Sequence, residues 1–281
     1  MRNKTVVETM LRLLACTRYE ILPTASAEDK VLEHVPVERV VTITASPGKG
    51  LEATLDLSER LCGHGYAVVP HLAARMVRGR SELAEICDRL TGKGITRIFV
   101  PGGDADPVGD YPDAFSLLAD LRDLGDPFDH VGITGYPETH PTISDDLTVQ
   151  SMWDKRQHAT HIVSNLTFDP KAIRAWVARL RARGVTMPLL LGMPGPVERA
   201  KLLNMATKIG VGESTRFLTK HRGTFLRLAA PGGFTGERFL EQCAPALAPP
   251  EARVEGLHVF TFNQIAETEA WRTRLMEQLA R

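Results

Sequence analysis

Short apolar runs alternate with stretches of helical spacing along the whole chain. Between the apolar runs, hydrophobic residues recur every three or four positions, as at Ile173, Trp176, Val177 and Leu180, and a glycine such as Gly184 then follows. This alternation predicts parallel strands joined by crossover helices. The eight strand-like runs are 16–22, 38–44, 66–71, 96–101, 129–134, 160–165, 187–192 and 256–262.

Eight strand–helix units in 281 residues predict an α/β fold, a single (β/α)8 TIM barrel over residues 1–281. The segment 210–255 is too long for one crossover helix, and we interpret it as extra helices before the last strand. An open doubly wound sheet is the alternative. It usually binds a dinucleotide through G-x-G-x-x-G after its first strand, and no such motif follows the run 16–22.

Composition narrows the class of protein. Lys+Arg and Asp+Glu both total 34, so no broad polyanion-binding face is expected and nucleic acid is not a predicted partner. No apolar run reaches the roughly 20 residues of a membrane span, and the polar N-terminal stretch is typical of an amphipathic helix rather than a secretory signal. The four cysteines form no CxxC pair, which indicates a reduced, cytoplasmic protein. His158 and His161 are spaced i,i+3 without further ligands, so no metal site is predicted.

Polar side chains gather where the predicted strands end, and barrel active sites lie at those ends. Exposure to water at the rim explains some of them. Glu20 is the most informative, because its sequence neighbours Tyr19, Ile21 and Leu22 are apolar or aromatic, and a carboxyl group in apolar surroundings tends to keep its proton. Such a group can protonate a substrate nitrogen. The residues at the strand ends are Glu20, Thr44, His71, Asp104, Tyr136, Glu138, His140, Asn165 and Asn263.

Several of these segments resemble the methylenetetrahydrofolate reductase family. Tyr-Glu-Ile-Leu-Pro at 19–23 is similar to its Phe-Glu-Phe-Phe-Pro-Pro, and Gly-Tyr-Pro-Glu-Thr-His-Pro at 135–141 to its Ala-Tyr-Pro-Glu-x-His-Pro. Weaker matches follow in order: Val-Pro-His-Leu at 69–72, Gly-Asp at 103–104, Asn-Leu-Thr-Phe-Asp at 165–169 and Leu-His-Val-Phe-Thr-Phe-Asn at 257–263. The resemblance implies a (β/α)8 barrel that reduces methylenetetrahydrofolate to methyltetrahydrofolate, usually with FAD.

Two departures from the family concern its flavin. The family has an arginine in its Leu-Arg-Gly-Asp turn, where this chain has Gly102, and a basic pair on the helix after the Tyr-Pro-Glu loop, where an ungapped alignment places Asp154. Loss of two cations around a pyrophosphate weakens binding by several kcal/mol, at about 1.5–3 kcal/mol per charged hydrogen bond. The pattern resembles the divergent branch in which NADH passes its hydride directly to the folate. We therefore expect FAD to be absent.

The resemblance implies roles for several of the strand-end residues. Glu20 would be the general acid for N10 of the folate, Asp104 would stabilise the iminium at N5 and bind the pterin, and Asn165 would bind the pterin amide. The pyrophosphate of NADH would lie near Lys155, helix-start amides or the loop 46–50. The residues expected on the cofactor side are Thr44, His71, Gly103, Tyr136, His140 and Lys155.

Other interpretations stay open at this point. The chain is compatible with a conventional FAD-dependent reductase, with a non-catalytic folate-binding or regulatory barrel, and with an unrelated barrel enzyme acting on a phosphorylated metabolite. The sequence does not choose between NADH and NADPH, between a monomer and a homo-oligomer, or between the two directions of the reaction.

Overall fold

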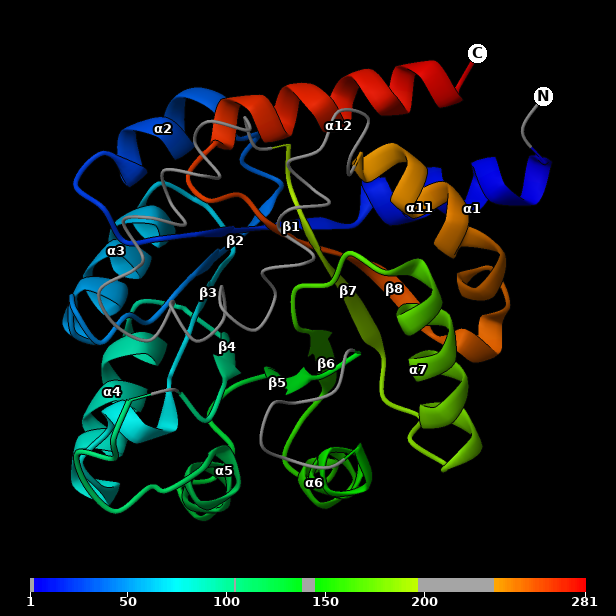
Figure 1. Ribbon diagram of the computed structural model, residues 1–281. Helices are drawn as coiled ribbons and strands as arrows, with labels where there is room; N and C mark the ends of the chain where they lie inside the picture. Colours follow the sequence, from blue (N-terminus) through cyan, green and yellow to red (C-terminus); the bar gives the residue numbers. More distant parts are fainter. Residues whose placement is uncertain (1–2, 104, 138–144, 197–234) are drawn as a thin grey trace.

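A computed structural model describes residues 3–103, 105–137, 145–196 and 235–281, with the side chains of 145–148 excepted (Figure 1). Each of the eight apolar runs forms a strand within two or three residues of its predicted limits. The strands are β1 (Thr17–Ile21), β2 (Val40–Ile43), β3 (Val68–Pro70), β4 (Arg97–Val100), β5 (His130–Gly135), β6 (His161–Ser164), β7 (Leu189–Pro194) and β8 (Val254–Phe260).

The eight strands form one parallel sheet in the order β3-β2-β1-β8-β7-β6-β5-β4. Its two edge strands approach each other, since His71, directly after β3, makes a parallel bridge to Phe99 of β4. The backbone N–H of Leu72 also donates to the carbonyl oxygen of Phe99 at 2.8 Å. The sheet therefore curves into a nearly closed barrel with helices around it, and the predicted (β/α)8 fold is confirmed (Figure 1).

The crossover helices begin and end where the sequence signals lie. The Asp113 carboxylate caps the start of α5, and the Asp169 carboxylate caps α7. Gly65, Gly94 and Gly184 adopt positive φ shortly after α3, α4 and α7, as glycine does beyond a helix end. The barrel helices are α2 (Ala27–His34), α3 (Glu52–Gly63), α4 (Arg80–Gly92), α5 (Ala114–Asp123), α6 (Asp145–Lys155), α7 (Pro170–Ala182) and α12 (Ile265–Leu279), with a short η1 (Ala74–Met76) after β3.

Further helical elements lie at the start of the chain and before the last strand, where an amphipathic helix and extra helices were predicted. The amphipathic N-terminal helix α1 (Lys4–Ala15) lies beside α11 (Gly236–Leu247), and η2 (Pro250–Ala252) leads into β8 (Figure 1). The Arg12 guanidinium of α1 fixes this arrangement by donating to the carbonyl oxygens of Leu247 and Val254. Helices therefore do precede the last strand, while residues 197–234 lie outside the described part of the chain.

The hydrophobic core has two parts because alternate residues of each strand point to opposite faces. The larger part fills the space between the sheet and the helices. The smaller lies inside the barrel and consists of Val69, Phe99, Val163 and Leu190, packed against Val40. Within the described ranges, no helix combines the length and hydrophobicity needed to span a bilayer.

Candidate active site

Glu20 faces the interior of the barrel at the carboxyl end of β1. Its neighbours Tyr19 and Ile21 face outward, because Tyr19 donates its phenolic hydrogen to Glu269 of α12 and both belong to the outer core. The side chain of Glu20 is only 15% exposed. The apolar residues beside Glu20 in the sequence thus do not surround its carboxyl group, and the expectation of an apolar pocket built from them is wrong.

Two histidines surround the carboxyl group instead. His258 of β8 places Nε2 2.8 Å from Glu20 Oε2, and its side chain is 2% exposed. His71 places Nε2 3.8 Å from the same oxygen and packs its ring against Phe99, with the centroids 4.6 Å apart. Among the described residues, both histidines approach the carboxylate at Oε2, so Oε1 is left for a ligand.

The His71 imidazole is neutral at ordinary pH. Burial lowers its pKa to about 4, against the opposing effect of the Glu20 carboxylate and with a smaller lowering from His258. At 3.8 Å the Nε2 atom lies beyond hydrogen-bond distance of Oε2 and has no other partner in the described structure. His71 is therefore a buried polar group that is free to accept or donate a hydrogen bond.

Further polar atoms without partners lie on the inner face of neighbouring strands. Thr42 is in register with Glu20, and Thr44 follows two residues later on the same face. Buried polar atoms in folded proteins almost always bond to protein, water or ligand, so a group of unpaired ones indicates a place for a polar ligand. Those inside the barrel are Thr42 Oγ1, Thr44 Oγ1, His71 Nε2, Thr134 Oγ1 and His258 Nδ1.

Other predicted residues are placed around the same end of the barrel. Asn165 follows β6 and is half-buried, its Oδ1 accepting from the Leu166 N–H at 2.8 Å. Tyr136 directly follows β5 and is also half-buried. Gly103 adopts φ 88° in the turn after β4, where its backbone lies over Ala73. These three positions stand at strand ends, as expected, and their roles stay predictions.

Lys155 is not brought to this cluster. It is the last residue of α6, shortly before β6 begins, which puts it towards the amino ends of the strands. Burial lowers its pKa, opposed by the carboxylates of Asp113 and Asp154. Asp104, Glu138 and His140 lie outside the described residues.

His258 was not among the predicted site residues. Its only signal was a polar residue within the apolar run 256–262, on the strand that pairs with β1. Asn263, in contrast, proves structural, since Oδ1 accepts from the Leu22 N–H and Nδ2 donates to Leu22 O and Thr24 Oγ1.

Two positions depart from the family pattern at its flavin-binding residues, Gly102 and Asp154. A side-chain carbon added at Gly102 would meet no atom within 4 Å, and the backbone N–H of Arg75 donates to the Gly102 carbonyl oxygen at 3.1 Å. Asp154 is exposed and its Oδ1 accepts from the Gln150 amide at 2.7 Å. Asp154, like Lys155, lies near the end of α6 and towards the amino ends of the strands, so of these two positions only Gly102 stands at the strand-end site, where it lacks the family's arginine.

A second polar cluster occupies the opposite, amino-terminal end of the barrel. Arg18 Nη1 lies 3.0 Å from His161 Nε2, and His161 Nδ1 lies 2.9 Å from Thr160 Oγ1. Burial, with the nearby Arg18 charge, lowers the pKa of His161 to about 3, and burial together with Arg97 lowers the pKa of Arg18 to about 10. This arrangement requires a neutral His161 that accepts from Arg18 and donates to Thr160.

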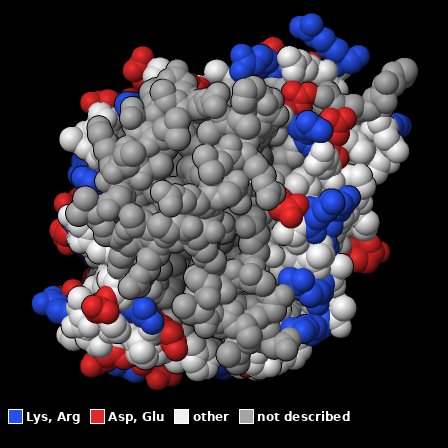
Figure 2. All heavy atoms as spheres, viewed as in Figure 1, with Lys and Arg blue, Asp and Glu red and all other residues white. Residues whose placement is uncertain are grey.

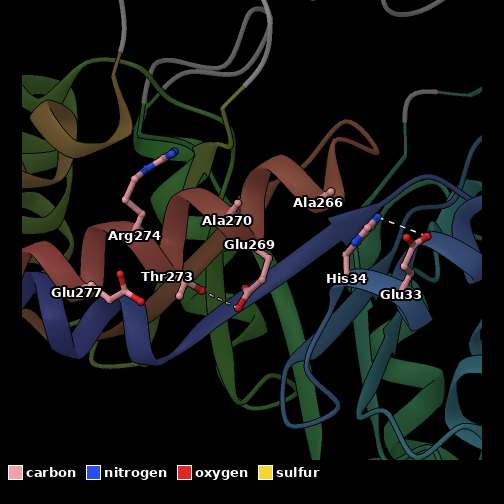
Figure 3. A pocket seen from close by; sticks show the side chains of 8 residues that line it. All are labelled: Glu33, His34, Ala266, Glu269, Ala270, Thr273, Arg274 and Glu277. Atoms are coloured by element: carbon pink, nitrogen blue, oxygen red, sulfur yellow. Dashed lines mark hydrogen bonds and ion pairs between the residues drawn. The ribbon is translucent and has the colours of Figure 1, made fainter.

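A surface pocket lies elsewhere, between α2 and α12 (Figure 3). It is separated from Glu20 by β1 itself, because Tyr19 contacts Glu269 on the outer side while Glu20 faces inward. The pocket residues are Glu33, His34, Ala266, Glu269, Ala270, Thr273, Arg274 and Glu277.

Around the face seen in Figure 2, described charges of both signs are interspersed. In the described part of the chain, no three His, Cys, Asp or Glu side chains converge as a metal site.

Comparison with known proteins agrees with this geometry. An uncharacterized protein from Clostridium thermocellum that binds two copies of 5-methyl-5,6,7,8-tetrahydrofolic acid has a similar fold, with TM-score 0.66, 10% identity, and coverage of 95% of this chain and 98% of that one. A 2,3-dimethylmalate lyase of the PEP mutase/isocitrate lyase superfamily aligns with TM-score 0.52 and 13% identity, over 99% and 88% of the two chains. Such low identities show a shared fold alone. The family model described as methylenetetrahydrofolate reductase matches residues 25–271, nearly the whole chain, and the protein therefore belongs to the methylenetetrahydrofolate reductase family.

Proposed function

We propose that the protein reduces 5,10-methylenetetrahydrofolate to 5-methyltetrahydrofolate with a hydride taken directly from NADH, and that Glu20 is the general acid. The observation that carries the proposal is the inward-facing carboxyl group, held at Oε2 by His258 and with no hydrogen bond to Oε1 among the described residues. The unpaired threonine and histidine atoms around it provide a polar lining for a ligand.

The substrate has a five-membered ring in which one methylene carbon bridges N5 and N10. Protonated Glu20 gives its proton to N10 while the bond from the methylene carbon to N10 breaks and its electron pair stays on N10. The cation that remains is an iminium at N5. NADH would supply the hydride that converts the methylene carbon into the methyl group.

The remaining residues of the chain position the reactants. Asn165 offers its amide N–H groups to the pterin, since its Oδ1 already accepts from Leu166. Thr44 and His71 line the side expected for the nicotinamide, next to the methylene carbon. Asp104 keeps its predicted role as the anion that stabilises the iminium. Without a flavin, both reactants must be bound at once, with about 3–3.5 Å between the reacting carbons.

Two further findings support a folate as the substrate. The family model covers nearly the whole chain, and a solved protein of similar fold binds 5-methyltetrahydrofolic acid. The lack of an arginine side chain at Gly102 favours direct transfer from the nicotinamide over a bound flavin.

The test combines a spectrum with kinetics on the purified full-length protein. We expect no flavin absorption, oxidation of NADH when methylenetetrahydrofolate is added, and intersecting initial-rate lines. A bound flavin with parallel, ping-pong lines would establish the conventional FAD-dependent reductase instead. Folate binding without NADH or NADPH oxidation would establish the non-catalytic barrel.

A further inference from the structure

His258 is the closest described partner of the Glu20 carboxyl group, and nothing in the proposed reaction has yet used it. Its Nε2 lies 2.8 Å from Oε2, a hydrogen-bond distance, and the side chain is 2% exposed. The other ring nitrogen, Nδ1, is buried and has no partner in the described structure. The ring edge of Phe260 packs against the imidazole at 4.9 Å between centroids.

These contacts decide which ring nitrogen carries the proton. A neutral imidazole has one N–H, and the hydrogen bond made by its nitrogens selects the tautomer. Only Nε2 has an acceptor within reach, so the proton belongs on Nε2, where it is donated to Oε2. An N–H on Nδ1 would be buried without an acceptor in the described structure, which destabilises that tautomer.

We propose that His258 is a positioning residue for the acid step, and that its Nε2–H, by occupying Oε2, assigns the acidic proton of Glu20 to Oε1, the oxygen that faces the substrate. The consequence of this assignment for catalysis rests on the proposed function. The same Nε2–H stabilises the carboxylate that forms when the proton has moved from Oε1 to N10 of the folate. No proton leaves His258 in this step, so the imidazole is neutral before and after it.

The groups around the pair are consistent with this assignment. His71 approaches the same oxygen from the β3 side at 3.8 Å and is neutral. His161 lies within electrostatic range of His258 on the amino-terminal side and is bonded to Arg18.

Nuclear magnetic resonance of the full-length protein labelled with ¹⁵N-histidine tests the assignment without any assay of activity. The His258 signals are identified by their loss in His258→Gln. We expect a proton on Nε2 alone at neutral pH. A proton on Nδ1 alone would mean that Glu20 donates to Nε2 and holds its proton on Oε2, and protons on both nitrogens would mean an ion pair; either result overturns the proposal.

Two variants then test the consequence for catalysis. His258→Leu removes the donor, and His258→Gln keeps an amide N–H near the position of Nε2. We expect the alkaline limb of the kcat–pH profile to move upward by about one pH unit in His258→Leu and to return in His258→Gln, since a donated hydrogen bond favours the carboxylate. An unchanged limb in His258→Leu refutes the positioning role. Absence of NADH oxidation by the wild-type protein would refute the proposed function alone, because the tautomer is measured independently.

Discussion

Acid should unfold this protein in part through His161, which is buried in its neutral form. The ring accepts from Arg18 at 3.0 Å and sits beside Thr160 at 2.9 Å, so a proton on Nε2 would break the first contact and face a positive charge. Burial is the larger cause of the lowered pKa of about 3. The unfolded chain has no such constraint, and its histidines titrate near pH 6.5.

The sign and size of the effect follow from proton linkage. Between about pH 6.5 and pH 3 the unfolded chain binds a proton at this residue and the folded chain does not, so stability falls as pH falls. At about pH 4.5, two units below the unfolded pKa, the loss from this residue is about 2.5 kcal/mol.

His161→Gln provides the comparison, since its amide oxygen can still accept from Arg18 but does not titrate. Urea unfolding followed by circular dichroism, at about pH 7 and about pH 4.5, gives the free energy of unfolding for both proteins. We expect the wild type to lose about 2.5 kcal/mol more than the variant between the two pH values. The difference between pH values cancels any packing cost of the substitution and the titration of His71. An equal loss in both proteins would refute the neutral, buried His161.

Other substitutions test separate parts of the structure. Gly192→Ala should destabilise the protein by about 3 kcal/mol in urea unfolding, because the new carbon would overlap the carbonyl oxygen of Ser164. Gly102→Ala, where the new carbon meets no atom within 4 Å, should change the free energy of unfolding by less than about 0.5 kcal/mol. Similar values for both variants would contradict the close approach of β6 and β7. Tyr19→Phe should cost about 1–2 kcal/mol through loss of the buried bond to Glu269, and a neutral result would show that Arg272 alone satisfies that carboxylate. Asp104→Asn should raise the KM for the folate more than the dissociation constant of NADH, measured by kinetics and by fluorescence titration; an effect on NADH alone would remove Asp104 from the pterin side.

The fold was predictable because its signals are local and repeated. Each apolar run became a strand, and Gly65, Gly94 and Gly184 mark helix ends through positive φ. The last strand begins two residues earlier than its apolar run, at Val254 rather than 256, and there Leu189 of β7 pairs with Val254 across an irregular register. Such an irregularity depends on two strands together and leaves no mark in either one.

The surroundings of Glu20 were predictable only in part. Its position at a strand end followed from the pattern, but its sequence neighbours Tyr19 and Ile21 face the other side of the sheet. The actual neighbours, His71 and His258, come from strands that lie far away in the chain and are brought together by closure of the barrel. The chemistry of the site therefore depends on the direction of side chains on paired strands. The residues next to Glu20 in the sequence do not reveal that direction.

Glu20→Gln in the full-length protein tests the central claim most directly. The amide can keep a hydrogen bond to His258 but is not an acid, and Glu28→Gln, on an outer helix beside Arg60, is the matched control. With folate and NADH affinities unchanged, we predict that Glu20→Gln lowers turnover of methylenetetrahydrofolate by about 10²–10⁴-fold while Glu28→Gln leaves it at the wild-type level. Turnover close to wild type in Glu20→Gln would contradict the assignment of this carboxyl group as the proton donor.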